Sequence, residues 1–283
     1  MIGGGFLARI IGTVTLALAL AGCGVLFTPG TDVEQDLSVF SAEQIFERGE
    51  FEMQRKEYED AAFYFGEIER LYPYSVWAKR ALIMQAYSHH QDRDYPNSRA
   101  SAQRYIDFYP ADADAAYAQY LLALSYYDQI DEVGRDQGLT FQALQSLRTV
   151  IEVYPDSEYA TSAILKFDLA FDHLAAKEME VGRYYLRHHH FAAAINRFRV
   201  VVEDFQTTSH TAEALYRLVE AYLSLGLTDE AQTAGAILGH NYQSTNWYED
   251  AYELLTEQGL KPRLRGNNWL SGIYRQTIKG EWL

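Results

Sequence analysis

The residues best suited to chemistry in this sequence are a run of histidines, His188, His189 and His190. Imidazole nitrogens bind transition metals, and histidine changes its charge near neutral pH. Consecutive residues of a helix point about 100° apart, so three in a row cannot all face one ion. The sequence contains no His-Glu-x-x-His, Gly-x-Ser-x-Gly, Walker or dinucleotide-binding glycine motif. We therefore expect no metal and no other cofactor, and nothing in the sequence supports catalysis.

A polar stretch between residues 127 and 139 is the second candidate, because carboxylates are the ligands that calcium prefers. Its charged and amide side chains are Asp128, Asp131, Glu132, Arg135, Asp136 and Gln137. The alternating Asp-x-Asp-x-Asp-Gly register of a calcium-binding loop is absent. A structural insert braced by Arg135, with Asp128, Asp136 and Gln137 as its other structural residues, is the better interpretation.

Cys23 is the only cysteine, which excludes intrachain disulfides and multi-thiolate metal sites. It follows an apolar run, residues 10–20, that is shorter than the roughly 20 residues of a membrane-spanning helix. The residues Leu20-Ala21-Gly22-Cys23 resemble the lipobox of bacterial lipoproteins, which implies cleavage before Cys23 and attachment of diacylglycerol to its thiol. The alternatives are an ordinary secretory peptide with a chance cysteine, or an uncleaved membrane helix.

This interpretation divides the N-terminal part into a signal peptide, residues 1–22, and a lipidated flexible tether, residues 23–38. Each buried methylene of an acyl chain contributes about 0.8 kcal/mol, so several chains together hold a protein on a membrane. Gly24 follows the cysteine where an aspartate would stand for retention, and this resemblance to lipoprotein sorting patterns implies the outer membrane.

The charge balance argues against nucleic acid as a partner. Lys and Arg number 24 against 39 Asp and Glu, a net charge of -15, which repels phosphate backbones and anionic headgroups. The C-terminal tail, residues 257–283, differs because it holds five basic and two acidic residues together with Trp269 and Trp282. Such a tail would dock on its own body or on a partner, and the alternative is a disordered end.

The elements that would position these residues are helices in a repeat. A small residue recurs at Ala61, Ser98, Ala143, Ala194 and Ala231, with spacings of 37, 45, 51 and 37 residues. An aromatic break, Tyr-Pro in three of its five occurrences, follows each of them and ends a helix. This pattern is typical of tetratricopeptide repeats, which predicts an all-α fold, a right-handed superhelix of about five helix pairs over residues 39–256.

The irregular spacings have separate causes. The insert before residue 139 lengthens one repeat to 45 residues, and a long helix from about residue 158 to 187 lengthens the next to 51. In the repeat frame, Gly49, Ala61 and Phe65 fall at positions 8, 20 and 24, and Gly182, Ala194 and Phe198 fall at the same positions of a later unit. These are the small and large positions at which the paired helices cross and only a small side chain fits.

Several stretches go beyond the repeat, and they are residues 125–130, 135–137, 154–160, 177–185, 193–198 and 215–222. Together they resemble the BamD family, tetratricopeptide lipoproteins of the outer-membrane β-barrel assembly machine. The resemblance implies a non-enzymatic scaffold on the periplasmic face of the outer membrane, which binds the POTRA region of BamA and works with the other components of the machine. The partner-binding residues that it implies are Asn196, Arg197, Glu220 and Tyr222.

The family's N-terminal repeats are thought to meet unfolded outer-membrane proteins, whose ends are aromatic and extended. The residues that we expect in this groove are Tyr58, Tyr64 and Tyr87, and the alternative is that they belong to the core. Arg197 has an alternative too, an ion pair with Glu203 or another residue of its own acidic body. Another tetratricopeptide lipoprotein, such as a secretin pilotin or a cell-wall synthase regulator, would share fold and anchor but not partner.

Overall fold

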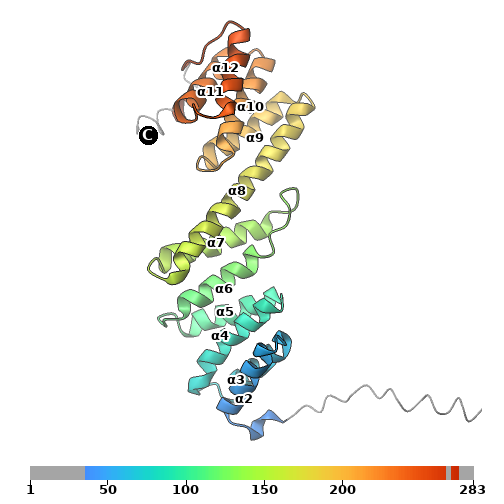
Figure 1. The fold of residues 1–283 in the computed structure, drawn as a ribbon, viewed down its shortest axis with the longest axis vertical. Helices are drawn as coiled ribbons and strands as arrows, with labels where there is room; N and C mark the ends of the chain where they lie inside the picture. The colour runs from blue at the N-terminus through green and yellow to red at the C-terminus, as the bar shows by residue number, and fades with distance from the viewer. Residues whose placement is uncertain (1–35, 266–268, 274–283) are drawn as a thin grey trace, which may run out of the picture. The chain divides into compact units, whose positions relative to one another are not determined.

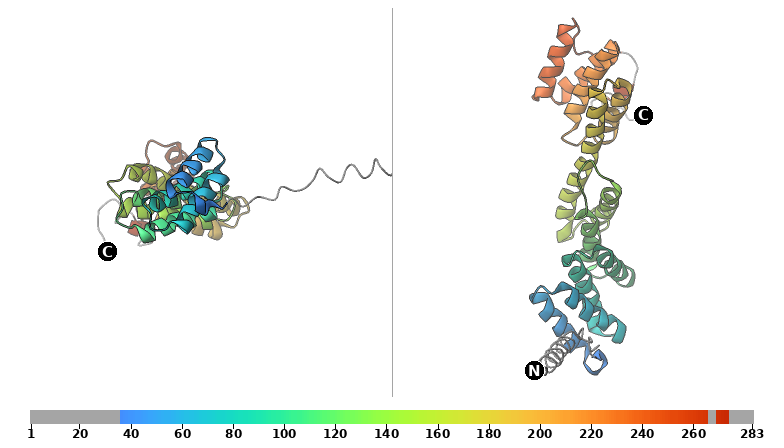
Figure 2. Two further views of the ribbon diagram at one scale, coloured as in Figure 1. Left: turned by 90° about the horizontal axis from the view of Figure 1, so that it is seen from below. Right: turned by 90° about the vertical axis from the view of Figure 1, so that its right-hand side faces the viewer.

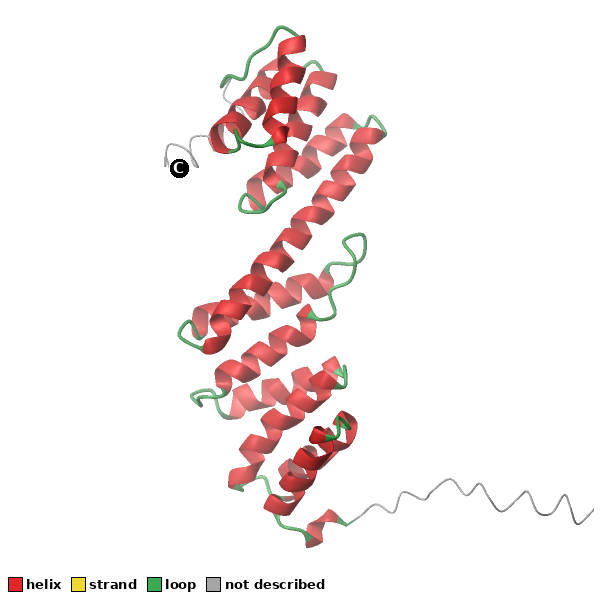
Figure 3. Cartoon of the chain, viewed as in Figure 1, coloured by secondary structure: helices red, strands yellow, loops and turns green. Residues whose placement is uncertain are grey.

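The structure is a computed structural model that describes residues 36–265 and 269–273. The described residues fall into two units, one ending at Ser41 with the short 3-10 helix η1 (Leu37–Val39) and one beginning at Ala42. The second unit is helical, and no strand occurs in the described ranges (Figure 3). None of the helices in this part of the chain is long and apolar enough to cross a bilayer.

Each helix of the second unit packs against the next one along the chain, and this order can be followed in Figures 1 and 2. The helix pairs are α2 (Ala42–Gln54) with α3 (Tyr58–Leu71), α4 (Val76–Gln91) with α5 (Tyr95–Phe108), α6 (Ala115–Tyr127) with α7 (Gly138–Val153), α8 (Glu158–Arg187) with α9 (Phe191–Asp204), and α10 (Thr211–Ser224) with α11 (Thr228–Asn241). Helix α12 (Asn246–Glu257) packs on α10 and α11. The all-helical, tetratricopeptide-like prediction is confirmed.

The aromatic breaks end the second helix of each pair. The residues that follow α3, α5, α7, α9 and α11 are Tyr72, Tyr109, Tyr154, Phe205 and Tyr242. Their amide groups still donate to the last turn of the helix. Their carbonyl oxygens accept from the amide three residues on, as Tyr72 O accepts from Ser75 N at 3.0 Å. The Ser75 hydroxyl then accepts from Ala78 N at 3.1 Å, which caps α4.

The small residues lie where the paired helices cross. Ala61, Ser98, Ala143, Ala194 and Ala231 are all 0% exposed. A Cβ atom on Gly49 would lie 2.7 Å from Phe65 Cε1, and one on Gly182 would lie 2.8 Å from Phe198 Cδ1. Both distances are shorter than van der Waals contact, so the glycines are required by the approach of the helices.

The insert lies between α6 and α7 and is held mainly by hydrogen bonds. Asp136 Oδ2 accepts from Gly138 N at 3.0 Å, and Gln137 Nε2 donates to the carbonyl oxygen of Arg135 at 3.1 Å. Lys177 Nζ on α8 donates to Gly134 O at 2.7 Å. The predicted brace, Arg135, makes only an exposed pair with Asp131 at 3.7 Å, so the insert is tied down by Lys177 instead.

Asp128 begins this insert directly after α6. Its Oδ2 lies 3.1 Å from Nε2 of His90 on α4, which connects the insert to an earlier repeat. Among the described residues, no three His, Cys, Asp or Glu side chains come together as metal ligands would. The acidic residues of the insert are therefore spread over separate local contacts.

Candidate partner-binding surfaces

Asn196 and Arg197 lie on the exposed face of α9. Arg197 Nη1 is 3.0 Å from Oε2 of Glu178 on α8, and the two side chains are 44% and 22% exposed. Glu203, the partner considered from sequence, pairs with Arg199 at 2.9 Å. Arg197 thus presents a guanidinium at the surface in an ion pair that solvent reaches.

Tyr222 does not reach the surface itself, because it is only 4% exposed on α10. Its hydroxyl accepts a hydrogen bond from Nε1 of Trp269 at 3.0 Å, and burial raises the pKa of this hydroxyl. The Trp269 ring in turn lies 4.9 Å below the guanidinium carbon of Arg199. Tyr222 therefore supports a surface formed by α9 and the tail.

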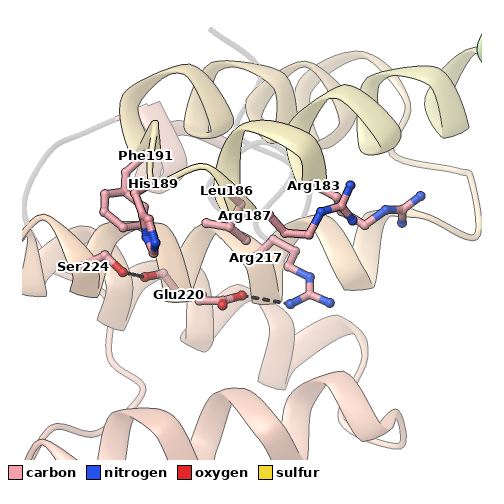
Figure 4. A pocket seen from close by; sticks show the side chains of 8 residues that line it. All are labelled: Arg183, Leu186, Arg187, His189, Phe191, Arg217, Glu220 and Ser224. Atoms are coloured by element: carbon pink, nitrogen blue, oxygen red, sulfur yellow. Dashed lines mark hydrogen bonds and ion pairs between the residues drawn. The ribbon is translucent and has the colours of Figure 1, made fainter.

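Glu220 lies in a pocket of about 600 Å³ between the end of α8 and α10 (Figure 4). The residues that line it are Arg183, Leu186, Arg187, His189, Phe191, Arg217, Glu220 and Ser224. Glu220 Oε2 is 2.9 Å from Arg217 Nη1, as the dashed line in Figure 4 shows. Glu220 thus pairs with Arg217 on its own helix, whereas Arg197 pairs with Glu178 on α8.

Glu213 on α10, which does not line the pocket, forms ion pairs with two of its arginines. Its carboxylate lies 2.9 Å from Arg183 Nη1 and 3.4 Å from Arg217 Nε. Burial opposes the charge of Arg217, but the hydrogen bond that Arg217 donates to Glu220 and the charges of both glutamates outweigh it and raise the pKa of Arg217. Arg183 and Arg217 are consequently fixed in place as permanent cations.

Sequence reasoning missed the arginines of this pocket. Arg183 and Arg187 are four residues apart, as are Glu213 and Arg217, and this spacing places each pair on one helix face. That signal was present in the sequence. The sequence does not show that these faces of α8 and α10 contact each other, because that contact depends on the packing between repeats.

The run of histidines lies at the turn from α8 to α9. His188 follows α8 directly, His189 has a positive φ of 61°, and His190 precedes α9. All three are exposed, and His189 alone of them lines the pocket beside Arg187. The change of backbone direction at His189 separates the three rings.

The three tyrosines expected in an N-terminal groove are half-buried and occupy different surroundings. Tyr58 is the first residue of α3. Tyr64 lies on α3 with its ring 5.8 Å from the guanidinium of Arg48. Tyr87 on α4 packs against the core cluster that contains Leu121.

More exposed aromatic side chains lie beside Tyr64. Phe63 is 55% exposed with its ring 5.5 Å from that of Tyr64, and Phe51 is 48% exposed with its ring 5.2 Å from Arg48. Helical spacing could have identified Phe63, because it is two residues from the buried Phe65 and so points to the opposite face.

Comparisons with known proteins place this architecture in one family. A family model described as outer membrane lipoprotein matches residues 40–237. The outer membrane protein assembly factor BamD of Caulobacter vibrioides is 45% identical over 90% of this chain and 83% of its own length. The chain belongs to the BamD family.

Other BamD proteins agree along most of the chain. The BamD of Rickettsia prowazekii is 44% identical over 75% of this chain and 84% of its own length. The BamD of Neisseria meningitidis serogroup A is 26% identical over 87% of this chain and 95% of its own length. The matched part contains α9, α10 and the N-terminal aromatic residues. Cys23 and residues 1–22, for which a signal peptide was predicted, lie outside the described residues.

Proposed function

We propose that this BamD-family protein is a scaffold of the β-barrel assembly complex that binds the POTRA region of BamA through its C-terminal repeats. The proposal rests on the family relationship and on one structural observation, the exposed guanidinium of Arg197 on α9. Asn196 lies beside it, and Tyr222 supports the neighbouring surface through Trp269. Glu220 would contribute through its pocket with Arg217.

The ion pair of Arg197 with Glu178 is suited to exchange. An exposed pair stabilises a protein by about 0–1 kcal/mol. A charge-assisted hydrogen bond that a partner shields from solvent contributes roughly 1.5–3 kcal/mol. A partner carboxylate would therefore replace Glu178 favourably, at small cost to the free protein.

The N-terminal repeats would receive unfolded outer-membrane proteins. Phe51, Phe63 and Tyr64 offer aromatic area on α2 and α3, and Arg48 lies over two of these rings. Aromatic side chains and an arginine stack readily on the aromatic residues of an extended chain. Tyr58 and Tyr87 would contribute their half-exposed edges to the same groove.

The protein would be held at the periplasmic face of the outer membrane by acyl chains on Cys23, with residues 23–38 as the tether. Residues 257–283 would serve as a docking tail for other components of the machine. This arrangement involves no catalysis, cofactor or nucleic acid. The net charge of -15 favours basic or neutral partner surfaces over anionic ones.

The test is purification of the affinity-tagged protein from detergent-solubilised envelopes. We expect a POTRA-containing barrel protein in near-equal amount, and a loss of about tenfold in its recovery with Arg197→Glu. Arg148→Glu, which makes the same charge change at an exposed position on α7, is the control. Undiminished capture by Arg197→Glu would refute the contact, and capture of a secretin or a peptidoglycan synthase without the barrel would refute the scaffold assignment.

A further inference from the structure

The arginine pocket between α8 and α10 has one cation, Arg187, that no other residue in the described ranges neutralises. Arg183 and Arg217 are bonded to Glu213 and Glu220. Arg187 is exposed, and in the described part of the chain no ion pair involves it. The three arginines and two glutamates together leave about one positive charge in a protein whose net charge is -15.

The pocket also has an apolar floor. Leu186 is 8% exposed, and the half-buried Phe191 packs against the core cluster of the C-terminal repeats. Figure 4 shows Phe191 and His189 at one end of the pocket, the arginines toward the other, and Leu186 between them. A ligand that fits both parts carries an apolar group next to an anion.

From this combination we propose that the pocket binds an acidic residue together with an adjacent apolar residue of an extended protein segment. The carboxylate pairs with Arg187, and the apolar side chain packs on Leu186 and Phe191. This inference rests on the proposed scaffold function and adds a second contact, separate from that of Arg197.

The charge of the site favours a carboxylate over a phosphate. A carboxylate carries one negative charge, which matches the guanidinium of Arg187, for which the described residues supply no ion-pair partner. A phosphate monoester carries about 1.5 to 2 negative charges, and Glu220 would repel the excess. An anionic lipid surface would in addition meet the net negative charge of the whole chain.

The position of the pocket favours an extended segment. The first helices of successive pairs contact one another from α2 through α4 and α6 to α8. The bond from Arg183 to Glu213 continues this contact from α8 to α10. Repeat proteins of this kind bind extended segments along surfaces that run over successive repeats, and the pocket is lined by residues of the first helices of two successive pairs, α8 and α10.

The experiment selects ligands without assuming a sequence. Random nine-residue peptides displayed on phage are selected on the full-length protein. We expect enrichment of Asp or Glu next to Leu, Ile or Phe. A synthetic peptide from that pool should bind about tenfold more weakly to Arg187→Glu and to Arg187→Gln, and with unchanged affinity to Arg148→Glu. Its amide analogue, Glu to Gln, should show the same tenfold loss against the unmodified protein.

Three outcomes would overturn the proposal. One is a selected pool without acidic residues, and another is binding that Arg187→Gln leaves unchanged. The third is Arg187-dependent binding of phosphatidylglycerol vesicles or inorganic phosphate in place of the peptides. Co-purification with Arg197→Glu separates the two hypotheses, because it reports on the barrel contact whatever the peptide selection shows.

Discussion

The crossing of α8 and α9 predicts that replacing Gly182 with alanine destabilises the protein. A Cβ atom there would lie 2.8 Å from Cδ1 and 2.9 Å from Cζ of Phe198, whose ring is 0% exposed. In an exposed helix, Gly→Ala stabilises by about 1 kcal/mol, because alanine restricts the unfolded chain and favours the helix. In this helix the added methyl group must instead displace a ring that the core holds on all sides.

The cost of such overpacking is about 1–3 kcal/mol, and contacts below 3 Å to a fully buried ring place it near the upper value. Subtracting the gain in helix propensity leaves a net destabilisation of about 2 kcal/mol for Gly182→Ala. In a domain of this size, 1 kcal/mol corresponds to roughly 2–4 °C in Tm. We therefore expect Tm to fall by about 4–8 °C.

The assay is thermal and urea unfolding followed by circular dichroism, with hydrogen exchange to locate the weakened region. Because repeats unfold partly independently, faster exchange should be concentrated in α8 and α9. Gly66→Ala is the matched control. Its Cβ would meet the end of the Gln85 side chain, with Nε2 at 2.5 Å and Cδ at 3.5 Å, and no backbone or ring atom. The amide of Gln85 can shift although its Oε1 accepts from Ser101 and Arg104, so we expect a change within about 1 kcal/mol.

A double variant tests the cause directly. Combining Gly182→Ala with Phe198→Leu should be less destabilising than the sum of the two single changes, by roughly 0.5–3 kcal/mol, because the smaller side chain makes room for the methyl group. A Gly182→Ala protein as stable as the unmodified one would refute the claim that the helix crossing requires glycine.

Three further predictions follow from contacts elsewhere. The hydrogen bond from Lys79, followed by others, lowers the pKa of Asp112 from 3.8 to about 2. The ionised Asp112 side chain therefore stabilises the folded state above pH 4, and this stabilisation is lost as the pH falls toward 2. The difference in Tm between wild type and Asp112→Asn, measured by calorimetry, should shrink over that interval. Trp269→Phe removes the donor to Tyr222 and should cost about 0.5–1.5 kcal/mol in urea unfolding, and an unchanged midpoint would contradict this. Lys177→Ala should speed hydrogen exchange in residues 131–136 with less than about 1 kcal/mol of global effect, whereas protected amides there would show that the insert needs no such bond.

The repeat architecture could be predicted because its determinants are local. Aromatic and proline residues end helices through their own backbone restrictions, and small residues recur at each crossing. The long helix was likewise predicted from the 51-residue spacing, and α8 extends from Glu158 to Arg187 as expected. Each of these signals lies within one repeat or between consecutive helices.

The surface contacts depend on packing that spacing does not encode. Glu178 is 19 residues from Arg197 and becomes its partner only when α8 and α9 pair. The arginine pocket similarly needs α8 to meet α10. Tyr222 is different, because it lies four residues after the buried Leu218, and helical spacing alone would have assigned it to the core.

The length of α8 links the two groups of surfaces proposed above. A helix of 30 residues extends about 45 Å, roughly twice as far as the other first helices of the pairs. Its part up to Leu174, with Ala163 and Ala170, packs in the clusters around α6 and α7, and its last turns, with Met179 and Leu186, pack in the C-terminal core. Because one unbroken helix belongs to both cores, a partner bound at Arg187 would contact an element that also packs against Tyr120. We therefore expect a rigid-body shift of the C-terminal end of α8 to be felt in the earlier repeats, since a sharp kink in α8 would disrupt its backbone hydrogen bonds.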